Sequence, residues 1–335
     1  MLGKGNWLAR TWRQRGLAAC LLWPVSLLYG WATGFHRWLY RVGLFKTARS
    51  SVPIIVVGNM VVGGAGKTPL VIALARHFIQ QGIQVGVVSR GYARPEKKCV
   101  EVLENTPISQ SGDEPALIFS ALAAPVFVAD RRSEAVHALL AKHPRTQLII
   151  SDDGLQHYSL ASDIKITVFD DRGVGNGWLL PAGPLRERFS PGRQNLVLHT
   201  GRAPAFGGYV SSRRLADHAV ARDGSVVHLQ DLKHQPLTAL AGIANPDAFF
   251  DMLRAQGLHL AQTLALPDHF DFSAFQFPEQ TSHVVLCTEK DAVKLFKTHS
   301  GSAFKLLAVL LEFTPEPAFL KAVDDLLAPL LGKAS

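Results

Sequence analysis

A glycine-rich segment between an apolar run and a helix-forming run constrains the fold of this chain more than any other feature. Residues 58–68 read GNMVVGGAGKT, and the apolar run PIIVVG at 53–58 leads into them. Glycines let successive backbone N–H groups turn toward an anion, and the start of a helix adds partial positive charge there. We therefore expect a strand, a phosphate-binding loop and a helix over about 67–80. This unit is typical of an α/β fold with a mainly parallel sheet.

Two side chains of this loop are candidate ligands of a bound nucleotide. Lys67 would reach the β- and γ-phosphates, and Thr68 would hold Mg²⁺. The pattern departs from its usual form because Val61 replaces the first glycine. Val62 replaces the lysine of many ATPases with a GGxGKT loop, which argues against a dimeric cargo ATPase. A glycine-rich turn without a ligand is the alternative interpretation. The expected nucleotide-binding residues are Val61, Val62, Gly63, Gly64, Ala65, Gly66, Lys67 and Thr68.

The rest of the chain alternates short apolar runs with helical stretches, which predicts further strand–helix units. We expect a basic arm at 1–50, a P-loop domain at 51–205 and a smaller α/β domain at 206–335. Further strands are expected at 85–89, 126–129, 147–151, 164–170, 195–199, 284–287 and 306–312. Helices are expected at 113–123, 131–142, 291–296 and from 317, and a strand–helix unit at 237–256.

Three short acidic segments are candidates for chemistry. Asp152 and Asp153 follow an apolar run, so they would lie at the ligand-binding edge of a parallel sheet and bind Mg²⁺. An Asp-Gly turn is the alternative. In GDEP (112–115), the spacing from Ser111 to Glu114 favours a helix capping box over chemistry. The TEKD sequence at 288–291 also has capping-box spacing. Its lysine stands one residue too late for a guanine-binding motif, which argues against a GTPase.

The N-terminal 50 residues carry the whole charge excess of the protein. They hold eight Lys or Arg and no acid, which leaves 27 basic and 27 acidic residues in the remainder. Five of the six tryptophans are here, and residues 16–35 are uncharged. Tryptophan favours the headgroup level of a membrane, and cations favour anionic lipid. The arm therefore predicts attachment to an anionic membrane surface.

The fold of this arm has several possible interpretations. We favour a helical hairpin or bent helix that lies in the membrane interface. A transmembrane helix is possible by length, although Pro24, Gly30 and Gly34 disfavour it. A cleaved signal peptide is disfavoured because basic, aromatic sequence follows the apolar run. A buried core helix would not explain the cations, and nucleic acid would not explain the apolar run. Three scattered cysteines indicate reduced thiols in a cytosolic setting.

Eight segments in a fixed order give the chain a family resemblance. It resembles the tetraacyldisaccharide 4′-kinases, which make lipid IVA in lipid A biosynthesis. The match is weaker in 202–235 and after 300. The matching segments are GNMVVGGAGKTP (58–69), VGVVSRGY (85–92), GDEP (112–115), SDDGLQH (151–157), GNGWLLPAGPLRE (175–187), AGIANP (241–246), DH (268–269) and TEKDAVK (288–294).

The resemblance implies roles for individual residues. It implies that Asp113 is the general base for the acceptor hydroxyl and that His269, an ambiguous loop histidine by sequence alone, pairs with it. Glu114, with Asp152 and Asp153, would organise Mg²⁺ and the phosphates of ATP. Arg90 and Arg186 would contact phosphate or form structural ion pairs.

The resemblance also implies a substrate and a location. The enzyme would transfer the γ-phosphate of ATP to the 4′-hydroxyl of tetraacyldisaccharide 1-phosphate, on the cytoplasmic face of the bacterial inner membrane. A P-loop kinase of a soluble sugar or nucleoside and a nucleotide-controlled membrane adaptor are the alternatives. No nucleic-acid or protein partner is implied.

Overall fold

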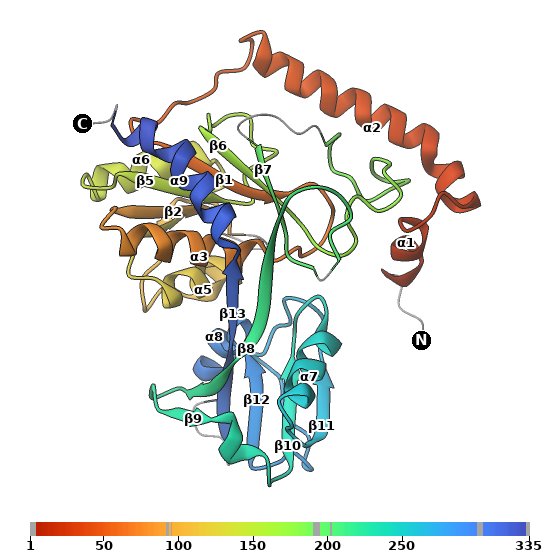
Figure 1. Ribbon diagram of the computed structural model, residues 1–335, viewed down its shortest axis with the longest axis vertical. Helices are drawn as coiled ribbons and strands as arrows, with labels where there is room; N and C mark the ends of the chain where they lie inside the picture. Colours follow the sequence, from red (N-terminus) through yellow and green to blue (C-terminus); the bar gives the residue numbers. More distant parts are fainter. Residues whose placement is uncertain are drawn as a thin grey trace.

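The computed structural model contains two lobes joined by one sheet of 13 strands (Figure 1). Tyr92, the last residue of the motif at 85–92, lies outside the described residues. The expected α/β class is confirmed, since most neighbouring strands are parallel. The structure describes residues 5–91, 94, 96–189, 195–201, 203–299 and 304–332.

The larger lobe, here the P-loop lobe, follows the expected strand–helix alternation. Its strands are β1 (Ile54–Asn59), β2 (Val85–Ser89), β3 (Val100–Glu101), β4 (Val126–Val128), β5 (Leu148–Asp152), β6 (Ile164–Phe169) and β7 (Asn195–His199). Its helices are α3 (Lys67–Gln80), α4 (Ile108–Ser111), α5 (Asp113–Ala121) and α6 (Arg132–Lys142). Parallel pairing of β1 with β5 and β6 places the carboxyl ends of these strands at one edge.

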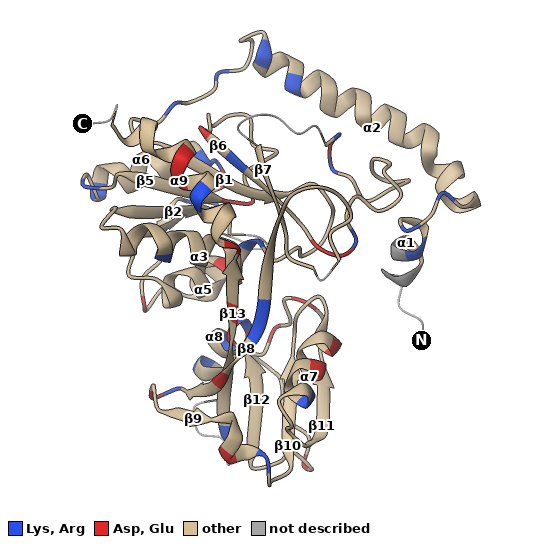
Figure 2. Ribbon diagram, in the orientation of Figure 1, with Lys and Arg blue, Asp and Glu red and all other residues tan. Residues whose placement is uncertain are grey.

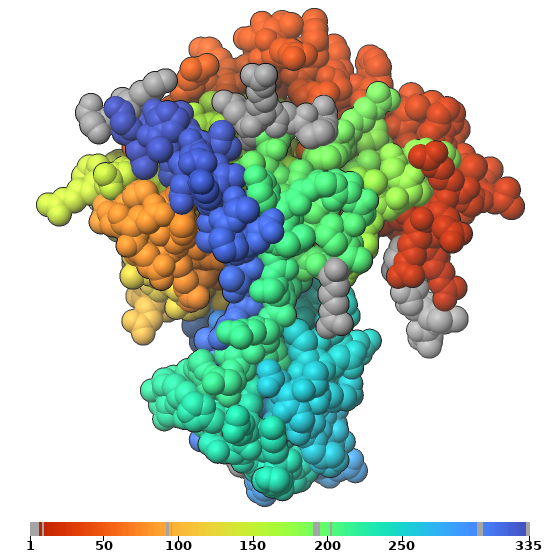
Figure 3. All heavy atoms as spheres, viewed as in Figure 1, coloured from red at the N-terminus to blue at the C-terminus, as the bar shows by residue number. Residues whose placement is uncertain are grey.

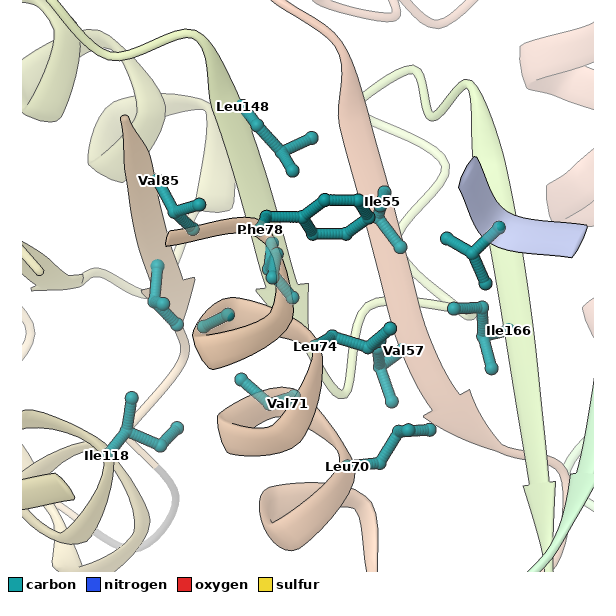
Figure 4. Packing of buried hydrophobic residues seen from close by; sticks show 14 of the residues in the cluster. Ile55, Val57, Leu70, Val71, Leu74, Phe78, Val85, Ile118, Leu148 and Ile166 are labelled. Atoms are coloured by element: carbon teal, nitrogen blue, oxygen red, sulfur yellow. The ribbon is translucent and has the colours of Figure 1, made fainter. Parts of the chain in front are cut away.

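The core of this lobe explains why 53–58 reads as an unbroken apolar run. All six residues of β1 are buried, as expected for a central parallel strand covered on both faces. Ile55 and Val57 point toward α3, where Leu74 and Phe78 pack against them (Figure 4). This packing fixes the direction of α3, and with it the position of the glycine-rich loop that connects β1 to α3.

The second lobe is smaller and holds the other end of the sheet, with helices beside it. It contains β9 (Val226–His228), β10 (Leu237–Ala241), β11 (Leu260–Ala265), β12 (Val284–Thr288), a 3₁₀ turn (Leu229–Leu232), α7 (Pro246–Ala255) and α8 (Glu289–Thr298). The capping interpretation of TEKD is confirmed, because the Thr288 side chain accepts a hydrogen bond from the Asp291 N–H. Asp291 also accepts from the Gly242 N–H at 2.9 Å, which joins α8 to the end of β10.

Two long strands, β8 (Tyr209–Ala221) and β13 (Lys305–Pro315), connect the lobes (Figure 1). β8 pairs in parallel with β7 in the P-loop lobe and antiparallel with β13 along most of its length. After β13, helix α9 (Pro317–Leu331) packs on the P-loop lobe, where Phe319 and Val323 join its core. The chain therefore crosses between the lobes twice. The domain boundaries at 50 and 205 remain predictions.

The N-terminal arm forms two helices, α1 (Gly5–Thr11) and α2 (Leu17–Arg41). Figure 3 shows them along the outer side of the P-loop lobe. The buried-core interpretation is wrong, because the apolar side chains of α2 face solvent, with Leu21 80% and Leu28 70% exposed. Helix α2 continues through Pro24 without a break. It is long and apolar enough to cross a membrane by length and composition.

Candidate functional site

Lys67 lies at the carboxyl edge of the P-loop sheet, between two polar groups. Its Nζ is 3.3 Å from Asn59 Oδ1 and 3.4 Å from Asp153 Oδ1, and the side chain is only 9% exposed. Asn59 ends β1 and its side-chain amide also donates to the Gly63 carbonyl at 2.7 Å. Sequence reasoning overlooked Asn59, although a polar residue at the end of an apolar strand is a signal of such a site.

The departure of Val61 from the usual loop pattern has a structural reason. Val61 is 1% exposed and forms a β-bridge with Leu185. The Val62 N–H donates to the Pro184 carbonyl at 3.0 Å. The first part of the loop is therefore an extended segment paired with the segment around 185, and the left-handed residues Gly63 (φ 99°) and Gly66 (φ 79°) form the turn into α3.

Two arginines from other elements contact the carbonyl side of the same loop. Arg172 donates to the carbonyls of Val62 and Gly64 at 2.9 and 3.2 Å, and its guanidinium pairs with Asp170. Arg213 of β8 donates to the Ala65 carbonyl at 3.4 Å. Because both arginines contact the carbonyls of the loop, its N–H groups can face the opposite side. Neither arginine was predicted, since nothing near either in sequence marks a ligand.

Asp152 and Asp153 lie beside this loop, as the sequence predicted. Arg132, itself 1% exposed, donates to both of their backbone carbonyls at 3.0 and 2.7 Å. Burial, followed by the nearby Glu114 carboxylate, raises the pKa of Asp152 well above its usual value. Asp153 adopts a left-handed conformation (φ 48°) and lies within 3.4 Å of both Lys67 Nζ and Arg186 Nη1. Left-handed backbone at a non-glycine residue is frequent at functional sites.

These carboxylates offer oxygen ligands to a hard cation. No described residue makes a hydrogen bond with the buried Asp152 Oδ1. Across the described part of the chain, no three His, Cys, Asp or Glu side chains gather as a complete metal site. Mg²⁺ commonly uses one or two carboxylates together with substrate phosphates, so such a cluster is not required. The donor set therefore fits Mg²⁺.

The capping interpretation of Ser111 and Glu114 is wrong. Gly112, at φ 85°, precedes helix α5, and no side chain caps the helix. The Ser111 hydroxyl instead donates to the carbonyl of Gly112 at 3.2 Å. Gly112 can adopt this conformation because it lacks a Cβ. Asp113 is therefore the first residue of α5, and its side chain is available for contacts outside the helix.

Within the described part of the chain, both side-chain partners of Asp113 come from the second lobe. His269 Nδ1 lies 2.9 Å from Asp113 Oδ2, and Lys294 Nζ of α8 lies 2.7 Å from the same oxygen. Asp113 is 10% exposed and Lys294 is 11% exposed. Burial by itself raises the pKa of Asp113, but the contacts with His269 and Lys294 outweigh it and hold the pKa below its usual value. The carboxylate form is therefore favoured.

His269 is held by its backbone as well as by Asp113. It has a left-handed conformation (φ 60°), and Lys290 Nζ lies 3.4 Å from its Nε2. Lys290 also pairs with Asp268 at 2.7 Å. A lysine donates, so Nε2 accepts and Nδ1 carries the proton directed at Asp113.

A cavity of about 500 Å³ opens beside Asp113 and His269. Lys290 and Lys294 belong to the TEKDAVK segment, whose role the sequence did not reveal.

The two arginines predicted to contact phosphate differ in their surroundings. Arg186 Nη1 lies 3.4 Å from both carboxylate oxygens of Asp153 and from Gln156 Oε1. Arg90 is exposed at the end of β2. Burial, then Arg132 and Arg90, lowers the pKa of His157 to about 4, which keeps this histidine neutral near pH 7. Arg186 therefore borders the carboxylate pair, whereas Arg90 lies near His157.

Comparison with known proteins agrees with this geometry. The sequence pattern of the tetraacyldisaccharide-1-P 4′-kinase family matches residues 18–328. The chain is 60% identical to the tetraacyldisaccharide 4′-kinase of Polaromonas naphthalenivorans (strain CJ2), over 97% of this chain and 96% of that protein. It is 50% identical to the corresponding kinase of Acidovorax sp. (strain JS42), over 96% and 95%.

A solved structure has the same fold. The crystal structure of the "apo" form of LpxK from Aquifex aeolicus in complex with ATP superimposes with a TM-score of 0.76. Its sequence is 28% identical, and the similarity covers 92% of this chain and 99% of that one. The chain therefore belongs to the tetraacyldisaccharide-1-P 4′-kinase family.

Proposed function

We propose that Lys67 and Asp113 act on opposite ends of one phosphoryl transfer, from ATP to the 4′-hydroxyl of tetraacyldisaccharide 1-phosphate. Family membership makes the chain a tetraacyldisaccharide 4′-kinase of lipid A biosynthesis. The ATP in the related Aquifex structure supports ATP as the donor. The observation that carries the proposal is the contact of Asp113 with His269 and Lys294. The next residue, Glu114, is near enough to Asp152, beside the phosphate-binding loop, for its carboxylate to raise the pKa of that residue.

On the donor side, Lys67 neutralises negative charge on the β- and γ-phosphates. The part of the loop from Gly63 to Thr68 surrounds these phosphates with backbone N–H groups. The Val62 N–H is bonded to the Pro184 carbonyl, so Val61 and Val62, which were expected to bind nucleotide, support the loop instead. Arg132, Arg186 and Arg90 supply further positive charge near the transferred group. Thr68, Glu114, Asp152 and Asp153 would hold Mg²⁺. When bound, this ion neutralises charge on the phosphate oxygens.

On the acceptor side, Asp113 accepts the proton of the 4′-hydroxyl. The bond from the 4′-oxygen to the γ-phosphorus forms while the bond from that phosphorus to the β–γ bridging oxygen breaks, which leaves ADP. His269 orients the Asp113 carboxylate through Oδ2. Phosphoryl transfer depends mainly on positioning and on late proton removal, so a carboxylate of low pKa is a sufficient base.

Incubation with labelled ATP and the acylated disaccharide in detergent, followed by thin-layer chromatography, tests this proposal. We expect labelled lipid from the unmodified protein and far less from Lys67→Ala in the same time. ATP consumption without labelled lipid would favour the membrane adaptor. Labelling of a soluble sugar or nucleoside, but not of the lipid, would favour a kinase of soluble acceptors. Either result would overturn the proposed function.

We also propose that the arm attaches the enzyme to the anionic cytoplasmic surface of the inner membrane. Figure 2 shows basic residues near the ends of α2 and an uncharged middle. The exposed tryptophans Trp23, Trp31 and Trp38 suit the headgroup level. Basic side chains near an anionic surface contribute about 1 kcal/mol each, and salt screens this term. Apolar contacts of the arm supply a part that salt does not remove.

Co-sedimentation with anionic vesicles tests this attachment. Neutralising the exposed Arg10, Arg13 and Arg41 should weaken binding most at low ionic strength. The matched control neutralises three exposed cations outside the arm: Arg131, Arg222 and Lys321. Arg15 is left unchanged because it donates to the Asn176 carbonyl. Equal losses for the two triple variants would contradict attachment through the arm.

A further inference from the structure

Residues 184–187, here called the bridging segment, are paired with the start of the phosphate-binding loop. A backbone N–H of the bridging segment donates to the Met60 carbonyl at 2.7 Å, and one of its carbonyls accepts from the Val62 N–H at 3.0 Å. Between these bonds, Leu185 forms an antiparallel bridge with Val61, and both side chains are buried. A displacement of the bridging segment would therefore displace the start of the loop as well.

The bridging segment is also attached to helix α2 of the arm. The Tyr29 hydroxyl donates to the Arg186 carbonyl at 2.9 Å. One turn earlier along α2, the buried Ser26 hydroxyl donates to the Leu179 carbonyl and accepts from the Ala182 N–H, each at 2.9 Å. These bonds hold α2 against the part of the P-loop lobe that supports the loop.

A second, indirect contact joins α2 to the end of the bridging segment. The Tyr158 hydroxyl donates to a carboxylate oxygen of Glu187. The Tyr158 ring packs against His36 and Tyr40 of α2, with centroid distances of 6.1 and 5.9 Å. The bridging segment thus contacts α2 directly through Tyr29 and indirectly through Tyr158.

Arg186 is held at three groups at once. Its N–H is bonded to the Met60 carbonyl, its carbonyl accepts from Tyr29, and its guanidinium lies 3.4 Å from Asp153. Only two rotatable backbone bonds separate the N–H of a residue from its carbonyl, so a fixed carbonyl limits the directions in which the N–H can point. A loop that is already held in place loses less conformational freedom when a ligand binds, and its affinity is higher for that reason.

We infer that Tyr29 is a positioning residue of the ATP site, and that the docked arm preorganises the phosphate-binding loop through the bridging segment. This inference rests on the proposed function, in which the loop binds the phosphates of ATP. Tyr29 acts through the Arg186 backbone and does not need to touch the nucleotide. Its neighbour Leu28 is 70% exposed, so α2 has one side for the membrane and another for the site.

The test compares two tyrosines of α2. Tyr29→Phe removes only the hydroxyl. Tyr40→Phe is the matched control, because Tyr40 is also half-buried but its hydroxyl makes no hydrogen bond with the bridging segment among the described residues. ATP binding to the full chain in detergent is measured by calorimetry. Tyr29→Phe should raise the Kd for ATP on the order of two- to tenfold, as for the loss of one hydrogen bond. Tyr40→Phe should leave it nearly unchanged.

Amide hydrogen exchange separates positioning from a general loss of structure. Exchange of the Val62 N–H should be faster in Tyr29→Phe than in Tyr40→Phe, because its bond to the bridging segment opens more often. The melting temperature and co-sedimentation with anionic vesicles should be the same for the two variants, since neither changes a charge. An equal Kd for ATP in the two variants, or unchanged exchange at Val62, would overturn the inference. An unmodified protein that binds no ATP would instead overturn the proposed function.

Discussion

The donor and acceptor sides of the site are built in different ways. Lys67, Asn59 and Asp153 all belong to the P-loop lobe, and their contacts stay at one sheet edge. Asp113 also belongs to that lobe, but His269 and Lys294 reach it from the second lobe. The donor side therefore depends on one packed sheet, whereas the acceptor side also depends on how the lobes meet.

This difference separates ATP binding from proton removal. Substitutions on the donor side should change both ATP binding and kcat. Changes on the acceptor side should leave nucleotide binding intact, because the P-loop core does not include the second lobe. The following variants test whether ATP binding on the donor side and proton removal on the acceptor side are separate.

Lys67→Ala should have the largest effect. It removes a nearly buried cation aimed at charge that develops on the phosphates, a loss on the order of 10²–10³ in kcat. The melting temperature should stay close to normal, since α3 is held by its apolar face. Steady-state kinetics measure the effect, with the exposed Lys321→Ala as control. Near-normal kcat would mean that Lys67 does not act on the phosphates of ATP.

Asp113→Ala should lower kcat on the order of 10² and leave ATP affinity nearly unchanged, because it removes the proposed general base. His269→Ala should show a smaller defect. If the two act as one unit, the double variant should be no slower than Asp113→Ala. Asp247→Ala is the matched control, because Asp247 is also an acid in the first turn of a helix. Strictly additive losses would contradict the pairing.

Lys294→Met should act mainly through pH. Lys294 and His269 together hold the pKa of Asp113 below its usual value, against the effect of burial. Without the lysine the pKa rises, so the ionised, proton-accepting form is lost at a higher pH. In a plot of kcat against pH, the acidic limb should therefore move to higher pH. At a fixed pH on that limb, kcat should fall about tenfold for each pH unit by which the limb moves. Lys294→Arg should restore the profile partly.

Lys297→Met provides the control for this pH effect. Lys297 lies one turn further along α8 and contacts the Thr106 carbonyl at 3.5 Å, not Asp113. Its removal should leave the acidic limb unchanged. A Lys294→Met variant with reduced kcat at every pH and an unmoved limb would indicate that Lys294 only supports the fold.

The strands and the donor side were largely predictable from sequence. Apolar runs that end in glycine or aspartate mark buried parallel strands with ligands at one edge, and β1 and β5 follow this rule. Lys67, Asp152 and Asp153 lie where the pattern placed them. The long strand β8 was missed because it is half exposed and rich in polar residues, and Arg213 was missed with it.

Local sequence patterns did not predict the acceptor side, because its contacts join residues far apart in the chain. The local pattern around Asp113 favoured helix capping, and only the family resemblance suggested chemistry. His269 is an isolated loop residue, and its contact with Asp113 spans 156 positions. Lys294 lies inside an ordinary amphipathic helix. Spacing rules describe neighbours within one element, so they contain no information about contacts between lobes.

Arg172→Ala should have the smallest effect, and it tests whether the donor side is held together from outside the loop. Arg172 contacts the Val62 and Gly64 carbonyls but is about half exposed, at 46%. Exposed charge contacts contribute about 1 kcal/mol or less, so KM for ATP should rise by less than about tenfold. The acidic limb should not move, because Arg172 is not among the groups that shift the pKa of Asp113. Kinetics at several ATP concentrations and pH values measure both quantities. If the acidic limb of the kcat–pH profile moves in Arg172→Ala, the phosphate-binding loop and Asp113 respond as one unit. The separation of the donor side from the acceptor side would then be wrong.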